Sequence, residues 1–194
     1  MPQASDSSRP VTVTVASVVV FLLLRDYHRL FTFLVLNQGV PKGLIYPGFT
    51  MIRVATIDEA YSVFVQIPEF GNYYPIEEVK RRLANGHRVL VAQSGQQLVG
   101  FKLGYPKTSE EFYSWLGGVL PAYRQGGIAQ RLLEHQEAWA RRAGFTRIAV
   151  KSMNKFPSML RLLIKNGYQV TQVDRFGDPQ KERLHFIKVL DAVS

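Results

Sequence analysis

The stretch that decides how the chain is interpreted is Trp115-Leu-Gly-Gly-Val-Leu-Pro-Ala-Tyr-Arg-Gln-Gly-Gly-Ile-Ala129, together with the residues that follow it to Ala143. It has the pattern of an apolar strand end, a tight glycine-bearing loop and the start of a long amphipathic helix. Glycines between a strand and a helix N-terminus let backbone N–H groups converge on an anion, and the helix dipole adds a favourable potential there. The stretch therefore predicts a site for a phosphate-bearing ligand.

Composition limits the classes of protein to which the chain can belong. Its 194 residues suit one domain with an extension, and they include no cysteine. Disulfides, thiolate metal sites and cysteine nucleophiles are therefore excluded, and the sequence predicts a cytoplasmic protein. The four histidines are scattered with no pair at ligand spacing, so no metal site is expected.

The formal net charge of +9 suits an anionic partner such as nucleic acid, anionic lipid or a polyphosphate cofactor. The basic residues are dispersed, with no run of five like charges and no repeat that interleaves basic and aromatic residues. A dispersed pattern favours a solvated basic surface, so no nucleic-acid partner is expected.

Residues 1–50 differ in character from the rest of the chain. Val11–Leu24 is an unbroken apolar run, but its fourteen residues fall short of the ~20 that a membrane-spanning helix needs. We expect an N-terminal extension without catalytic residues, and membrane association is not favoured. A natural start at Met51 is the alternative, since well-punctuated globular sequence begins there.

Residues 51–194 read as alternating strands and helices in the order β-α-α-β-β-β-α-β-α-β-β. This order predicts an α/β fold of the α+β type, with a mixed sheet and helices on both faces. The helix of the opening stretch has apolar residues at steps of three and four, which predict a buried stripe: Ile128, Leu132, His135/Gln136, Trp139 and Ala143. The other expected elements are strands 51–55, 88–93, 98–105, 111–119, 146–151, 168–174 and 182–190, and helices 59–66, 75–83 and 157–165.

The glycine loop does not fit the two commonest phosphate-binding motifs. Gly127 is followed by Ile128 and Ala129, where a Walker A loop needs Lys and Ser or Thr. The dinucleotide fingerprint Gly-x-Gly-x-x-Gly is absent as well. The residues that do stand here are Val119-x-Pro121-x-Tyr123-Arg124-x-x-Gly127-x-Ala129.

This pattern resembles the signature of the GNAT superfamily of N-acetyltransferases, and the resemblance covers about residues 51–194. It implies a mostly antiparallel central sheet in which one strand carries a bulge and splays from the next, and acetyl-CoA as co-substrate. The pyrophosphate of acetyl-CoA would lie on the backbone amides of Arg124, Gln125, Gly126, Gly127, Ile128 and Ala129. Pantetheine would pair with the backbone of Val119 and Leu120, and Gly117-Gly118 would form the bulge. Asn154 would hydrogen-bond the pantetheine or cap the following helix.

The resemblance also implies transfer of an acetyl group to a primary amine by direct attack in a ternary complex. A base must remove an ammonium proton, and Glu111 is the candidate we single out from a pool that includes Glu69, Glu77 and Glu110. The family often places a tyrosine where this chain has Leu163. Tyr168 or a water would then protonate the leaving thiolate, unless the thiolate leaves unassisted.

Three points stay open at this stage. The acceptor could be a small amine, a peptide N-terminus or a lysine side chain of a protein. A CoA-binding regulatory or structural module with weak or no catalysis is the alternative to an enzyme. A homodimer is compatible with the sequence, which does not determine the oligomeric state.

Overall fold

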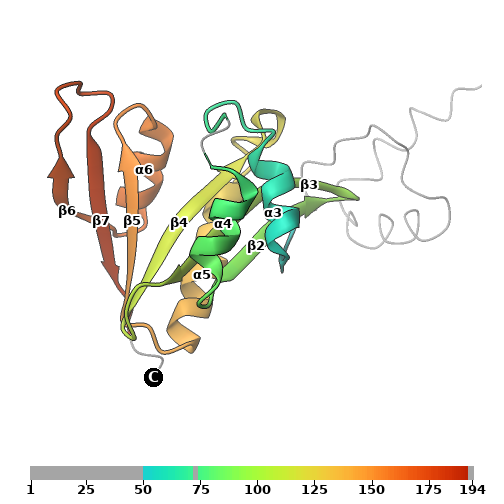
Figure 1. The fold of residues 1–194 in the computed structure, drawn as a ribbon, viewed down its shortest axis with the longest axis horizontal. Coiled ribbons are helices and arrows are strands. Elements are labelled where there is room, and N and C mark those ends of the chain that lie inside the picture. Colours follow the sequence, from blue (N-terminus) through green and yellow to red (C-terminus); the bar gives the residue numbers. More distant parts are fainter. Residues whose placement is uncertain (1–49, 72–73, 192–194) are drawn as a thin grey trace, which may run out of the picture. The chain divides into compact units, whose positions relative to one another are not determined.

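The computed structural model describes residues 50–71 and 74–191 (Figure 1). The expected extension, apart from Thr50, lies outside the described residues. The described elements follow the predicted order: β1 (Thr50–Val54), α3 (Ile57–Phe64), α4 (Ile76–Leu83), β2 (Arg88–Ser94), β3 (Gln97–Pro106), β4 (Glu111–Val119), the 3-10 turn η1 (Pro121–Tyr123), α5 (Ile128–Arg142), β5 (Arg147–Met153), α6 (Pro157–Lys165), β6 (Gln169–Asp174) and β7 (Arg183–Val189).

The strands form one seven-stranded sheet in the order β1-β2-β3-β4-β5-β7-β6. Every neighbouring pair is antiparallel except β4 and β5, which are parallel and are connected by α5. A parallel pair needs a crossover connection of this length. The predicted mixed, mostly antiparallel sheet is confirmed.

Helices cover both faces of the sheet, as predicted (Figure 1). On one face, α3 and α4 pack on β2, β3 and β4 through buried residues that include Phe64, Leu83, Phe101 and Trp115. On the other face, α5 and α6 cover a second set that includes Phe112, Leu133, Leu163 and Phe186. We call these the α3/α4 face and the α5/α6 face.

Helix α3 begins two residues earlier than the sequence predicts. Thr56 is its N-cap: the Thr56 side chain accepts the N–H of Glu59, and the Glu59 carboxylate accepts the N–H of Thr56. This reciprocal capping box satisfies two N–H groups and starts the helix at Ile57. The helix ends at Phe64, two residues before the predicted end.

The buried stripe of α5 differs from the predicted one. His135 and Ala143 are exposed, while the buried residues are Ile128, Leu132, Leu133, Gln136, Glu137 and Ala140. The prediction followed apolar residues, but this helix buries two polar side chains toward the sheet. Gly144 follows the helix with φ +88°, as expected for a residue that ends a helix in the left-handed conformation.

Strand β4 carries a bulge and diverges from β5. Leu103 on β3 pairs with Leu116 and the next residue, Gly104, pairs with Ser114, so Trp115 is the extra residue. The predicted bulge at Gly117-Gly118 is therefore wrong, because both glycines stay in register with β3. Strand β4 pairs with β5 only over Glu111–Ser114, and the two strands separate beyond that point (Figure 1).

Candidate functional site

The loop between β4 and α5 presents a row of backbone donors. No acceptor within the described part of the chain takes the N–H of any residue from Gln125 to Gln130. The last three of these groups belong to the first turn of α5, where an α-helix has no internal acceptor. Unpaired N–H groups at a helix N-terminus attract anions, and the helix dipole adds to the attraction.

The loop reaches this geometry through two left-handed residues. Gly127 is the N-cap of α5 at φ +75°, and Gln125 lies at φ +68°. For a residue other than glycine such a φ is uncommon and costs on the order of 1 kcal/mol or more. Such strain gathers at ligand-binding sites, so the backbone at Gln125 makes the loop a candidate for one.

Arg124 ties the loop to the loop between α3 and α4. Its guanidinium donates to both carboxylate oxygens of Glu69, at 2.6 and 2.9 Å, and its Nε donates to the carbonyl of Val119 at 3.0 Å. The hydrogen bonds from Arg124 outweigh the desolvation of Glu69 and hold the pKa of that carboxyl below its usual value. Both side chains are partly exposed, so the pair is screened by solvent.

Backbone alternation determines which N–H groups of β4 point toward the divergence of β4 and β5. The N–H of Leu120 donates to Val99 on β3, and its carbonyl accepts from Tyr123. The N–H of Leu120 is therefore engaged within the protein, and the pairing of pantetheine with the backbone of Val119 and Leu120 stays a prediction. Alternate residues of a strand direct their N–H groups to opposite sides, so Val119 and Gly117 face away from β3, toward the divergence.

Glu111 does not suit the role of general base. Its side chain is 8% exposed and forms ion pairs with Lys107 at 3.0 Å and with Arg147 at 2.9 Å. Burial alone would raise its pKa, but the two cations outweigh burial and lower it. Glu111 also lies in the paired part of β4, eight residues or roughly 26 Å of strand before Val119. These ion pairs and this position favour a structural role for Glu111, and its role as the base stays a prediction.

Tyr168 lies in a buried polar cluster on the α5/α6 face. It is 3% exposed, and burial together with the neighbouring Glu137 carboxylate raises the pKa of its phenol. On the same face, β3, β4 and α5 also bury the polar side chains of Lys102, Ser114 and Gln136. We call these five residues the buried polar cluster. The sequence gives only a weak signal for this cluster. Lys102 is a single lysine in an otherwise apolar strand, between two glycines on the same face.

Asn154 is not a helix cap. Its amide donates to the carbonyl of Pro179 in the loop between β6 and β7, at 2.8 Å. Helix α6 instead begins at Pro157 with Phe156 as its N-cap residue and without a side-chain cap. The capping alternative for Asn154 is therefore wrong, and its contact with pantetheine stays a prediction.

Two features thus meet at one end of the sheet: a helix N-terminus with unpaired amides, and a parallel strand pair that separates beside it. Comparison with known proteins identifies this arrangement. The sequence matches the acetyltransferase (GNAT) family over residues 55–168, more than half of the chain. The chain belongs to the GNAT family.

Solved GNAT structures resemble this chain in fold. The ribosomal-protein-S18-alanine N-acetyltransferase of Escherichia coli matches with a TM-score of 0.66 and 12% identity over 75% of this chain and 97% of its own. Ard1 of Thermoplasma volcanium gives 0.62 and 17% over 73% and 97%. A GNAT acetyltransferase of Elizabethkingia anophelis, solved with acetyl-CoA bound, gives 0.60 and 15% over 73% and 98%. No curated protein matches the chain.

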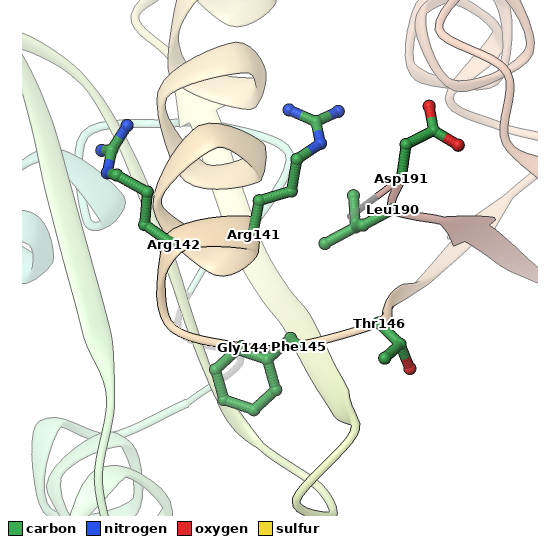
Figure 2. A pocket seen from close by; sticks show the side chains of 7 residues that line it. All are labelled: Arg141, Arg142, Gly144, Phe145, Thr146, Leu190 and Asp191. Atoms are coloured by element: carbon green, nitrogen blue, oxygen red, sulfur yellow. The ribbon is translucent and has the colours of Figure 1, made fainter. Parts of the chain in front are cut away.

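A surface hollow of about 620 Å³ lies at the C-terminal end of α5 (Figure 2). The loop between β4 and α5 precedes the other end of that helix. The lining of the hollow comes from the end of α5, the turn that follows and the end of β7: Arg141, Arg142, Gly144, Phe145, Thr146, Leu190 and Asp191. None of the predicted site residues lines it. Among residues 50–71 and 74–191, no helix is long and apolar enough to cross a membrane.

Proposed function

We propose that this GNAT protein transfers an acetyl group from acetyl-CoA to a primary amine by direct attack in a ternary complex. The observation that carries the proposal is the row of unpaired N–H groups at the start of α5, placed where β4 separates from β5. A pyrophosphate would bind this row, and the pantetheine arm would lie between the separating strands. Two of the similar structures, those from Elizabethkingia anophelis and Salmonella typhimurium, were solved with acetyl-CoA.

The backbone of β4 would position the thioester. The N–H groups of Val119 and Gly117 face the divergence by alternation from Leu120, whose N–H donates to β3. An N–H aimed at the thioester carbonyl would stabilise the oxyanion that forms when the amine attacks. The loop residues from Arg124 to Ala129 would hold the phosphates, with Gly127 free of any side chain at the approach.

The amine must be neutral when it attacks, so its proton has to leave first. Glu111 is held ionised between two cations and lies far from Val119. Glu69 is engaged by Arg124. The chemistry therefore favours proton removal through water over removal by either carboxylate.

The acceptor is an amine of a small molecule, a peptide or a protein. Similar structures carry names that differ in acceptor, including an S18-alanine N-acetyltransferase and an aminoglycoside 6′-acetyltransferase. A catalytically weak CoA-binding module is the second candidate, because Leu163 stands at the position where the family often has a tyrosine. Release of CoA thiol in the presence of a panel of amines separates the two, since a module binds CoA without turnover.

The loop itself is tested by Gly127→Glu. We expect loss of CoA binding in calorimetry, because bulk and negative charge would stand where the phosphates bind. Gly177→Glu is the matched control: Gly177 has φ +77° and open space around its Cα, as Gly127 has at φ +75°, but it lies in the loop between β6 and β7. Unchanged CoA affinity in Gly127→Glu, or equal losses in both variants, would contradict the assignment.

A further inference from the structure

Lys102 carries a buried ammonium group, and its side chain passes over a glycine of β4. It is 5% exposed and lies on β3, where it pairs with Gly117 of β4. A Cβ added to Gly117 would stand 3.3 Å from Cγ of Lys102. The lysine side chain therefore runs over Gly117 on the α5/α6 face, and Gly117 provides the space that lets it approach the divergence of β4 and β5.

Glu137 of α5 interacts with Lys102 and also with the strand on the other side of β4 and β5. Its Oε2 accepts from Lys188 of β7 at 2.6 Å, and its charge acts on Lys102 of β3. Glu137 thus interacts with a residue on each side of β4 and β5, since these two strands lie between β3 and β7. Glu137 lies nine residues after Ile128, or about 13 Å along the axis of α5. Ser114 lies at a similar distance from Val119 along β4.

The buried polar cluster has more hydrogen-bonding groups than partners. Within the described residues, the Ser114 hydroxyl, both amide atoms of Gln136, Oε1 of Glu137 and the Tyr168 hydroxyl are buried without a hydrogen bond. Ser114 is also the last residue of β4 that pairs with β5. Unsatisfied buried polar atoms are rare in native structures and indicate a missing partner. A polar group that enters between the separating strands would supply one.

We propose that the Lys102 ammonium stabilises the thiolate of CoA as the thioester breaks. The inference rests on the proposed function, in which the thioester lies between β4 and β5. The acceptor nitrogen forms the new C–N bond, and the electron pair of the C–S bond goes to sulfur. Sulfur leaves as a thiolate beside the positive charge on Nζ of Lys102, and it takes a proton from water when CoA leaves.

Lys102 suits this role better than Tyr168 does. Desolvation lowers the pKa of Lys102 to about 8, against a weaker opposite effect of Glu137, so the ammonium keeps its charge near neutral pH. A positive charge nearby stabilises an ionised thiol, whose ordinary pKa is about 8.5. Burial raises the pKa of Tyr168 far above that of a thiol, so proton donation from its phenol would be unfavourable.

The other charges around the site favour a thiolate as well. Glu137 faces it from α5 but is neutralised by Lys188 of β7 at 2.6 Å, and Arg141 of α5 lies 3.9 Å from the same carboxylate. Tyr168, which immediately precedes β6, is uncharged at neutral pH. With Lys102 included, the surroundings carry a net positive charge, which lowers the pKa of a bound thiol.

The test uses CoA itself as probe, with no acceptor. The ultraviolet absorbance of the thiolate is followed against pH for CoA bound to the full-length protein and for free CoA. We expect the bound thiol to ionise at a pH lower by about one unit or more. Lys102→Met should remove the shift, Lys102→Arg should keep it, and Lys165→Met, an exposed lysine of α6, should leave it intact.

Each other result overturns the inference in a distinguishable way. A bound thiol with the pKa of free CoA in the unaltered protein would overturn it without reliance on any variant. A shift that persists in Lys102→Met and disappears in Tyr168→Phe would assign the stabilisation of the thiolate to Tyr168 instead. If CoA does not bind to the unaltered protein, the proposed function and this inference both fall.

Discussion

Lys102 keeps an ammonium group in the protein interior, and that costs stability. Its side chain is 5% exposed and has no ion pair at 4.0 Å or less among the described residues. Moving such a charge out of water is unfavourable unless a partner compensates. The cost is of the kind that functional sites carry, since buried titratable groups with shifted pKa values gather there.

The pH dependence of stability should reveal this cost. The folded-state pKa of about 8 lies below the ordinary 10.5, so the penalty is complete below about pH 8 and disappears above about pH 10.5. We expect Lys102→Met to raise the free energy of unfolding by up to about 3 kcal/mol near pH 6.5. Urea unfolding near pH 6.5 and near pH 9.5 should show that the gain shrinks at the higher pH. A loss of stability at both pH values would contradict this.

The pair between Arg124 and Glu69 places a carboxylate beside the proposed phosphate site. Glu69→Gln should leave Arg124 free to contact the anion, and we expect CoA to bind about threefold more tightly, because the pair is exposed and its energy small. Calorimetry at low and high salt would measure the gain, which should diminish as salt screens it. Glu77→Gln, an exposed residue of α4, is the control. Weaker binding in Glu69→Gln would show that the pair positions the loop instead.

Some residues of the candidate site could be predicted from sequence, and others could not. The loop could be predicted because its glycines and the start of α5 are adjacent in the chain, so local geometry determines where their N–H groups point. The surroundings of Glu111 could not be predicted in full, because Lys107 is a local partner but Arg147 comes close only through the pairing of β4 with β5. Lys102 was missed because a single lysine in a strand is usually exposed.

At the scale of the element, β4 combines two roles that alternate along its backbone. One set of N–H groups holds the strand to β3, as Leu120 does through Val99. The other set, with Val119 and Gly117, faces the divergence. Since the bulge at Trp115 shifts the alternation by one residue, the groups that face β5 above the bulge differ from those that an unbroken strand would present.

Amide hydrogen exchange tests this alternation directly. On addition of CoA we expect the N–H of Val119 to exchange more slowly, because it gains an acceptor in the pantetheine. The N–H of Leu120 should change little, since it already donates to Val99 at 2.9 Å. Residue-resolved exchange measured by NMR, with and without CoA, would distinguish the neighbours. Protection of Leu120 alone would reverse the assignment of the two faces.

Strand and helix bounds were largely predictable, whereas the bulge was not. Turn residues such as Asn166-Gly167 and the start of α6 at Pro157 act locally, and the structure confirms α6 over Pro157–Lys165. A bulge depends on the register between two strands, here between Leu103 and Leu116. Gly117 and Gly118 suggested a bulge from sequence. In the structure, their lack of side chains instead allows neighbouring side chains to pack closely against β4. A Cβ on Gly118 would come within 2.7 Å of Ile67.

At the scale of the whole described sheet, the fold consists of two parts that meet along a short seam. Strands β1 to β4 form one part and β5 to β7 the other, and they pair only over Glu111–Ser114 and Arg147–Val150. Glu111 strengthens this seam, since its carboxylate joins Lys107 and Arg147. The seam lies at the end of β4 far from the loop, so the strands can separate at the other end to receive a ligand.

Glu111→Gln should therefore weaken the fold and spare the chemistry. We expect the free energy of unfolding to fall by about 2 kcal/mol at pH 7, because the ion pairs with Lys107 and Arg147 both lose the negative charge. The pKa of Glu111 is lowered in the folded state. Its contribution is therefore present above its ordinary value of 4.5 and lost as the pH falls through the folded value.

The gap between Glu111→Gln and the unaltered protein should thus narrow in acid, as urea unfolding at pH 7 and below about pH 4 would show. Glu110→Gln is the matched control, since Glu110 precedes it with an exposed side chain. Acetyl transfer to the best amine of the panel should keep its rate and its pH profile in Glu111→Gln. Transfer abolished in a variant of unchanged stability would restore Glu111 as the base, and would place the reacting amine at the closed end of the divergence.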